Sequence, residues 1–218
     1  MPEKELVYSH NGDHPYEQHV IALISGYLAA QSFPVKRIKV IVTFSPTLSS
    51  FSKHKLDLEL VGPKPSGQVE LIYNSLFLVQ DPMNFFETVV PHEVAHVLNE
   101  ISAYKTGVEV QEHGLEWAEW LEKLSDKAEP AASLPDTEFD NRAIILNNGG
   151  VLATCDCEGN ERYHAYRNSG AKVADLRRGN VECKQCGSTL VISDVSELPN
   201  SIRSDIEFIK QDLKERNT

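Results

Sequence analysis

The chain has little of what marks membrane or secreted proteins. Its longest early apolar stretch, Val20 to Ala30, is interrupted by Ser25 and Gly26 and is too short to cross a bilayer. The opening residues are charged, and no apolar signal-peptide region follows them. We therefore expect a cytoplasmic protein without membrane contact. Hydrophobic residues make up 41% of the 218 positions, enough for one domain or for a domain plus a small module.

Positive charge is also scarce, with 21 Lys and Arg against 32 Asp and Glu and a net charge of −11. This balance argues against a generally basic surface that coats nucleic acid. The acidity is concentrated in the middle of the chain, because residues 109–140 carry ten acidic side chains against two lysines. Residues 150–190 carry six basic and five acidic side chains and are close to neutral.

Cysteine is rare and falls in two close pairs. The pairs are Cys155 with Cys157 and Cys183 with Cys186. In a reducing compartment this spacing favours metal binding over disulfides. The 25 residues between the pairs are enough for a three-stranded ribbon that brings two turns together, so we predict a closed, structural four-thiolate zinc site. Gly187 suits a turn that needs a positive φ. His164 could replace one thiolate, but we interpret it as an ordinary ribbon histidine.

The most informative motif is His92-Glu93-Val94-Ala95-His96. On a helix, residues four apart share a face, so His92 and His96 point at the same spot. The pair supplies two nitrogen ligands for zinc, and Glu93 can act as the base for a water bound to the metal. The metzincin pattern is excluded because Asn99 and Ser102 stand where it requires Gly and His.

A zinc site of this kind needs a third protein ligand and an open position. His113 is the favoured candidate, because Gly114 gives its backbone room to turn just before a predicted helix. Glu116 and Glu119 are the alternatives, although Glu116 also suits the first turn of a helix as an exposed acid. Trp117 and Trp120 flank this segment, and we expect both to pack in the core, with substrate binding as the less favoured alternative.

Periodicity and turn residues predict an α+β fold. Asp81 and Pro82 are typical of a helix start, and a stripe of Ile202, Ile206, Ile209 and Leu213 predicts a short terminal helix. The expected helices lie at 15–31, 83–102 and 112–127, and the expected strands at 39–44, 56–60 and 68–73, with Asn74 beginning a turn. We divide the chain into a core (1–127), an acidic Ala/Pro linker (128–148), a zinc ribbon (149–192) and a C-terminal extension (193–218).

One stretch resembles a nucleic-acid surface, since its cations could contact phosphates and its tyrosines could stack on bases. The candidate DNA contacts are Arg162, Arg167, Arg177 and Arg178, with Lys172, Lys184, Tyr163 and Tyr166 among them. A solvated ribbon face remains the alternative. The remaining histidines lack partners at ligand spacing and are interpreted as surface residues: His10, His14, His19 and His54.

Taken together, segments 89–96, 113–117 and 155–187 resemble the SprT family, the bacterial relatives of the eukaryotic Spartan protease. The resemblance implies a minimal zincin-like core with an HExxH helix, followed by a zinc ribbon, with one catalytic and one structural zinc. It also implies a DNA-stimulated metalloprotease that acts on proteins lodged on or crosslinked to DNA. A substrate peptide is expected to pair with an edge strand, for which we choose Gln68–Tyr73. The alternative is a non-proteolytic DNA- or protein-binding adaptor with a structural zincin core.

Overall fold

The computed structural model describes residues 15–31, 38–61, 64–107, 111–126, 139–169 and 171–216. The chain forms two compact units, residues 1–139 and residues 140–218. Each unit combines helices with a small sheet, so the fold is mixed α and β. The second unit includes residues assigned above to the linker and to the C-terminal extension. No helix within the described part of the chain has the length and apolar character needed to span a membrane.

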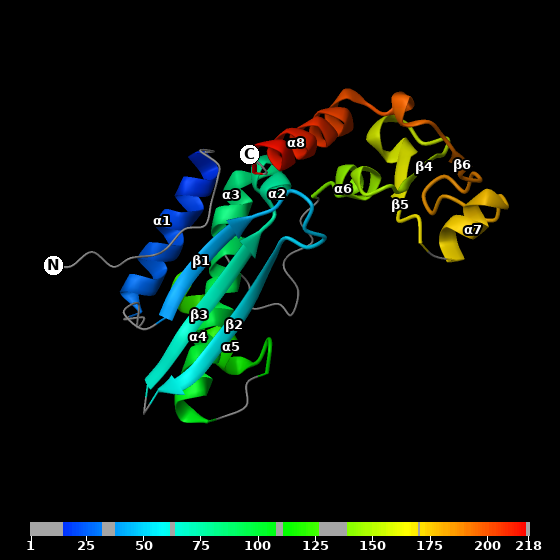
Figure 1. The fold of residues 1–218 in the computed structure, drawn as a ribbon. Coiled ribbons are helices and arrows are strands. Elements are labelled where there is room, and N and C mark those ends of the chain that lie inside the picture. The colour runs from blue at the N-terminus through cyan, green and yellow to red at the C-terminus, as the bar shows by residue number, and fades with distance from the viewer. Residues whose placement is uncertain are drawn as a thin grey trace. The chain divides into compact units, whose positions relative to one another are not determined.

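The first unit is built on three strands in the order β1-β3-β2 (Figure 1). β1 (Ile38–Phe44) runs parallel to β3 (Lys64–Tyr73), and β2 (Ser52–Val61) runs antiparallel to β3. The predicted strand at 56–60 is longer and begins at Ser52. The choice of 68–73 as an edge strand was wrong, because β3 pairs on both sides and its backbone groups serve two neighbours. The open edges belong to β1 and β2.

One face of this sheet is apolar, and two helices cover it (Figure 1). Residues alternate between faces along a strand, and β1 accordingly buries Ile38, Val40, Val42 and Phe44. On the opposite face of β2 the side chains are exposed and charged, from Lys53 to Glu59. α1 (Pro15–Ala30) and α4 (Val90–Thr106) pack against each other over the apolar side. The predicted helix at 15–31 is confirmed.

Asn74 joins the sheet to the helical segment. It was expected to begin a turn, but it caps α2 (Ser75–Gln80), a helix that was not predicted from the sequence. Its side-chain oxygen accepts from the backbone N–H groups of Leu76 and Phe77, and its amide donates to the carbonyl of Leu48 at 2.6 Å. This fully buried side chain therefore fixes the loop that leads into β2.

The predicted helix start at Asp81 and Pro82 is confirmed, but the helix is not uniform. α3 (Pro82–Asn84) continues into a π-helical turn (Phe85–Val89) and then into α4, which extends to Thr106. Such π turns occur frequently at functional sites. The next helix, α5 (Leu115–Leu124), is shorter than predicted, and Trp117 and Leu121 are buried on its inner face.

The second unit contains the cysteines. Its sheet has the order β5-β4-β6, all antiparallel, formed by β4 (Val151–Thr154), β5 (Tyr163–Tyr166) and β6 (Val191–Ile192). The helices are α6 (Arg142–Asn147), α7 (Ala171–Arg177) and α8 (Asn200–Arg216), with short 3-10 turns at Gly159–Arg162 and Val195–Glu197. The predicted terminal helix is confirmed as α8, which packs against α6 and buries Ile202 and Ile209.

Candidate metal centres

Three histidines from two helical segments meet in the first unit. His92 and His96 stand one turn apart on α4, and His113 lies in the turn before α5. Their Nε2 atoms are separated by 3.2 Å (His92 and His96), 3.1 Å (His96 and His113) and 3.4 Å (His113 and His92). Three nitrogens bound tetrahedrally to zinc at about 2.0–2.1 Å lie about 3.3 Å from one another. The triangle has the dimensions of a three-histidine metal site.

Burial keeps the two helix histidines in the form that binds metals. Desolvation lowers the pKa of His92 to about 4 and that of His96 to about 3, against the opposing charge of Glu93. A neutral imidazole carries one N–H and one lone pair, so three Nε2 atoms at one point cannot all donate to one another. Three lone pairs directed at a common point are stabilised by a cation. The cluster could therefore hold a metal ion and is compatible with zinc.

Trp117 packs against all three imidazoles. It is fully buried, as predicted, and its ring centroid lies 4.9 Å from that of His92, 5.3 Å from His96 and 4.7 Å from His113. The contacts with His92 and His113 are edge-to-face, a favourable geometry for aromatic rings. Trp117 thus restricts the rotation of the histidines and keeps their Nε2 atoms together.

The other candidates for a third ligand lie outside this cluster. Glu116 and Glu119 are exposed, and within the described residues the group that converges here consists of the three histidines. Gly114 has an ordinary φ of −80°, so it is not needed for a left-handed turn. A Cβ at this position would lie 3.0 Å from Cβ of Gln111, so the glycine allows the backbone to pass close to the Gln111 side chain. Trp120 is only partly buried, with Nζ of Lys123 4.5 Å from its ring centroid.

Glu93 is buried and bound on both carboxylate oxygens. The hydroxyl of Ser52 donates to Oε1 at 2.7 Å, and Nδ1 of His54 lies 2.7 Å from Oε2. Burial by itself raises the pKa of Glu93, but the hydrogen bond and charge of His54, together with the Ser52 hydroxyl, outweigh it and lower the pKa. Glu93 is therefore ionised near neutral pH and can accept a proton.

The interpretation of His54 as a surface residue was wrong. It lies on β2, is largely buried, and bridges two carboxylates, with Nε2 2.7 Å from Oε1 of Glu100. Its ring also stacks on His96 at a centroid distance of 4.7 Å. Burial opposes its protonation, but the bonds to Glu100 and Glu93 raise its pKa to about 10. Sequence spacing could not identify His54, because it lies 39 positions before Glu93 in the chain.

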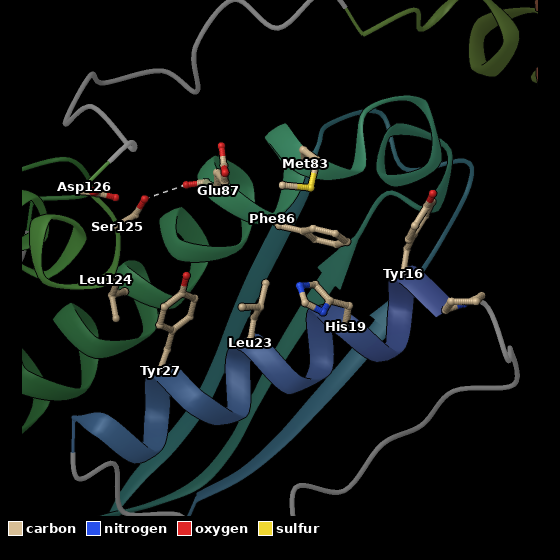
Figure 2. Close-up of a pocket in the computed structure, with 11 residues that line it drawn as sticks. Tyr16, His19, Leu23, Tyr27, Met83, Phe86, Glu87, Leu124, Ser125 and Asp126 are labelled. Carbon is tan, nitrogen blue, oxygen red and sulfur yellow. Dashed lines mark hydrogen bonds between the residues drawn. The ribbon is translucent and has the colours of Figure 1, made fainter.

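The other histidines differ from His54. His19 is exposed, as predicted, and its ring centroid lies 4.4 Å from that of Phe86. It lines a cavity of about 680 Å³ between α1, the π-helical turn and the end of α5 (Figure 2). Tyr16, Leu23 and Tyr27 of α1 also line this cavity. Its described lining includes no member of the histidine cluster. His10 and His14 lie outside the described residues.

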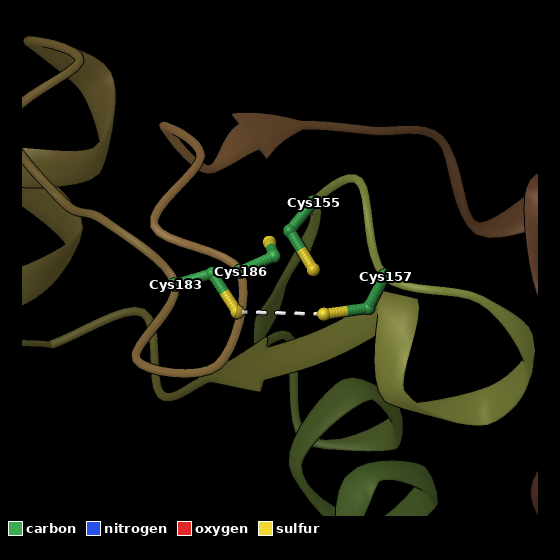
Figure 3. Close-up of side chains that lie close together, drawn as sticks. All are labelled: Cys155, Cys157, Cys183 and Cys186. Carbon is green, nitrogen blue, oxygen red and sulfur yellow. Dashed lines mark hydrogen bonds between the residues drawn. The ribbon is translucent and has the colours of Figure 1, made fainter.

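The four cysteines form a second cluster, in the second unit (Figure 3). None is in a disulfide, and their sulfurs lie within 4.8 Å of one another, with 3.8 Å between Cys157 and Cys183. Tetrahedral zinc with sulfur ligands at about 2.3 Å sets the sulfurs about 3.8 Å apart. Four thiolates this close repel one another without a cation. This cluster could also hold a metal ion and is compatible with zinc.

The loops around the cysteines support this arrangement. Gly187 has a φ of +75°, as predicted, and its N–H donates to the carbonyl of Cys183 at 2.9 Å. The Ser188 hydroxyl and backbone lower the pKa of Cys186 to about 6, which favours the thiolate. His164 is not part of the four-sulfur cluster, but its Nε2 lies 3.3 Å from Sγ of Cys155. It can orient that sulfur from outside the cluster.

The four arginines expected to contact DNA are all exposed in this unit. Arg177, at the end of α7, donates to Asn168, which follows Arg167, so these two cations lie on neighbouring segments. Arg178 forms an ion pair with Asp175 at 2.5 Å, which reduces its free charge. Arg162 ends the 3-10 turn that precedes β5. The arginines are accessible, but acidic side chains lie among them.

A mixed α/β protein with one three-histidine cluster and one four-cysteine cluster is a candidate metalloprotein with two sites. The SprT-like family model matches residues 29–139, about half of the chain, including the histidine cluster and Glu93. The chain therefore belongs to the SprT-like family, which confirms the resemblance noted in the sequence.

Three similar proteins carry the name Protein SprT. The one from Pectobacterium atrosepticum is 29% identical over 124 residues, which cover 56% of this chain and 63% of the relative. The one from Pectobacterium carotovorum matches to the same extent. The one from Photorhabdus laumondii is 25% identical over 142 residues, or 64% of this chain and 65% of the relative. The chain thus spans less than two thirds of the length of these relatives. No solved structure matches it.

Proposed function

We propose that this protein is a zinc-dependent metalloendopeptidase with a minimal zincin-like core. The observation that carries the proposal is the convergence of three histidine Nε2 atoms. The buried, ionised Glu93 lies between two of these histidines in the sequence of α4. His92, His96 and His113 would hold the metal and leave one position open. Zinc bound there would polarise the scissile carbonyl and lower the pKa of water to about 7.

Glu93 would act as general base and then as general acid. Its lowered pKa leaves the carboxylate free of protons at neutral pH, so it can take one from the attacking water. The same carboxyl can pass this proton to the amine that leaves when the peptide bond breaks. Ser52 contacts one carboxylate oxygen of Glu93 and His54 contacts the other. Each oxygen keeps a further lone pair that can accept the proton.

The open edge of β2 replaces β3 as the proposed site for the substrate backbone. The N–H of Asn74 donates to the carbonyl of Phe51, which makes Ser52 and Tyr73 a non-hydrogen-bonded pair. The alternation of an antiparallel pair then turns the backbone groups of residues 52, 54, 56 and 58 away from β3. Ser50 donates to the carbonyl of Ser52 and Tyr104 to that of Leu58.

The carbonyls of Ser52 and Leu58, at the two ends of the open edge of β2, therefore already accept hydrogen bonds. Residues 54–56 form the accessible centre of this edge. A substrate strand paired there would lie beside Glu93, because the His54 side chain reaches that carboxylate from the same strand. Main-chain pairing is insensitive to side chains and would let the enzyme accept many sequences.

We further propose that the substrates are proteins on DNA and that the cysteine unit supplies the DNA contact. The resemblance to the Spartan proteases and the exposed arginines of this unit support the proposal. The second candidate function is a non-proteolytic adaptor that uses both metal sites structurally. The buried carboxylate of Glu93 disfavours the adaptor, because a purely structural metal site has no need of an ionised base beside it.

The function is tested by incubating the zinc-loaded protein with a DNA-binding protein, alone and with single- or double-stranded DNA. We expect zinc-dependent cleavage that DNA accelerates about tenfold or more, since bringing both proteins to one strand raises their effective concentration. A chelator should stop the cleavage, and added zinc should restore it. Cleavage that persists in chelator would contradict a metal mechanism, whereas DNA binding without any cleavage would favour the adaptor.

Charge reversal at Arg177 and Arg178 tests the proposed DNA surface. Each phosphate contact contributes about 0.9 to the slope of log affinity against log salt, so losing two should reduce the slope by about two. We expect weaker DNA binding and weaker DNA stimulation together, with DNA-independent cleavage unchanged. The matched control reverses two exposed lysines of α8, Lys210 and Lys214, in the same unit. An unchanged slope in the arginine variant would place the DNA contact elsewhere.

A further inference from the structure

A chain of three side chains connects β2 to α4 beside the histidine cluster. Glu93 and Glu100 stand seven residues apart on α4, and His54 lies between their carboxylates with 2.7 Å contacts to each. Seven residues are close to two helical turns, so both carboxylates project from the same side of the helix. His54 comes from β2, and neither glutamate belongs to the three-histidine cluster.

This geometry constrains the orientation of Glu93. A glutamate side chain has several rotatable bonds, and a base acts efficiently only when it is held within hydrogen-bond reach of the proton it removes. The Ser52 hydroxyl and the His54 ring each contact a different oxygen of Glu93, which defines the plane of the carboxylate. Two contacts fix a plane that a single contact would leave free to rotate.

His54 is itself held from two further directions. Its ring stacks on His96 with an interplanar angle of 19°, and Nε2 is anchored by Glu100. Glu100 is therefore placed to act on Glu93 only through the imidazole. Removing a group that orients the residues of a metal site from outside commonly changes metal affinity or activity about 10- to 100-fold.

We infer that His54 is a positioning residue for Glu93, with Glu100 as its anchor, so that the base is aligned by the strand that faces the substrate. This inference rests on the proposed peptidase function. Backbone groups of His54 belong to the open edge of β2, and its side chain reaches the base. The strand that pairs with the substrate is thus the strand that orients the carboxylate, which keeps the base in register with the scissile bond.

Steady-state cleavage by variants of the zinc-loaded 218-residue chain tests this role. We expect His54→Ala to lower kcat about 10- to 100-fold with KM within about twofold, because the side chain acts on the chemical step. His54→Asn should recover part of kcat, since its amide can still donate to Glu93. Glu100→Ala should lower kcat less than His54→Ala does, and should have no further effect in a His54→Ala background. Zinc content should stay the same throughout.

The controls separate positioning from structural support. His19→Ala and Glu119→Ala remove exposed side chains of the same two types from the same unit and should leave kcat unchanged. The positioning role would be overturned by wild-type kcat in His54→Ala, by losses that follow the folded or zinc-loaded fraction, or by additive effects of the two substitutions. If His54→Ala does not fold, the Asn and Glu100 variants decide by the same criteria.

Failure of this inference is distinct from failure of the proposed function. If the wild type cleaves and Glu93→Gln does not, while His54→Ala cleaves normally, the positioning role fails and the peptidase remains. If the wild type cleaves no substrate in the presence of zinc and DNA, the peptidase proposal fails and the positioning role falls with it.

Discussion

Glu93→Gln is expected to reduce peptide hydrolysis about 10³-fold or more, since general acid–base catalysis contributes about 10²–10⁴-fold in enzymes. The amide keeps the size of the carboxylate and can still accept from Ser52, but it cannot take up a proton from water. Zinc should remain bound, because the three histidines are unchanged. The measurement is kcat/KM for a protein substrate, together with zinc per chain by elemental analysis.

Glu116→Gln is the matched control for this substitution. It removes the same charge from an exposed position on α5, three residues after His113, and should retain near-normal activity. This variant also tests Glu116 as the alternative third ligand, since a ligand change would reduce zinc content. Near-normal cleavage by Glu93→Gln would remove Glu93 from the mechanism.

Cys183→Ser is expected to have the largest effect on stability. Cys183 and Cys155 belong to the buried core of the second unit, packed with Ala153, Leu176 and Leu190. Structural zinc sites contribute about 10–16 kcal/mol of apparent binding free energy in small zinc-finger peptides at pH 7. A core this small cannot replace that contribution, so the variant should lose one zinc per chain and the folded state of this unit.

Hydrogen exchange can locate the loss within the chain. Protection should disappear from β4 and β5 and persist in β1 and β3, because the two sheets belong to separate units. Lys184→Ser, at the exposed neighbouring position, is the control and should keep two zincs and full protection. Two zincs retained in Cys183→Ser would mean that the four-thiolate site does not bind metal as proposed.

Much of the fold followed from local patterns in the sequence. The alternation of β1, the cap formed by Asp81 with Pro82, and the apolar stripe of α8 depend on residues close in the chain. The Asn74 cap was missed because turn and helix-cap signals use the same residue types. The central place of β3 was also missed, since its apolar alternation suits an edge strand as well as a central one.

The two metal clusters show the same division between local and tertiary information. By itself the sequence determined that His92 and His96 share a helical face and that each cysteine pair lies in one turn, because these are consequences of spacing. Only the tertiary structure decided that His113, rather than Glu116 or Glu119, meets the pair, and that His54 reaches Glu93 and Glu100. Those contacts depend on the docking of β2 and α5 against α4, which the packing of buried side chains from distant segments determines and which leaves no periodic signal in the chain.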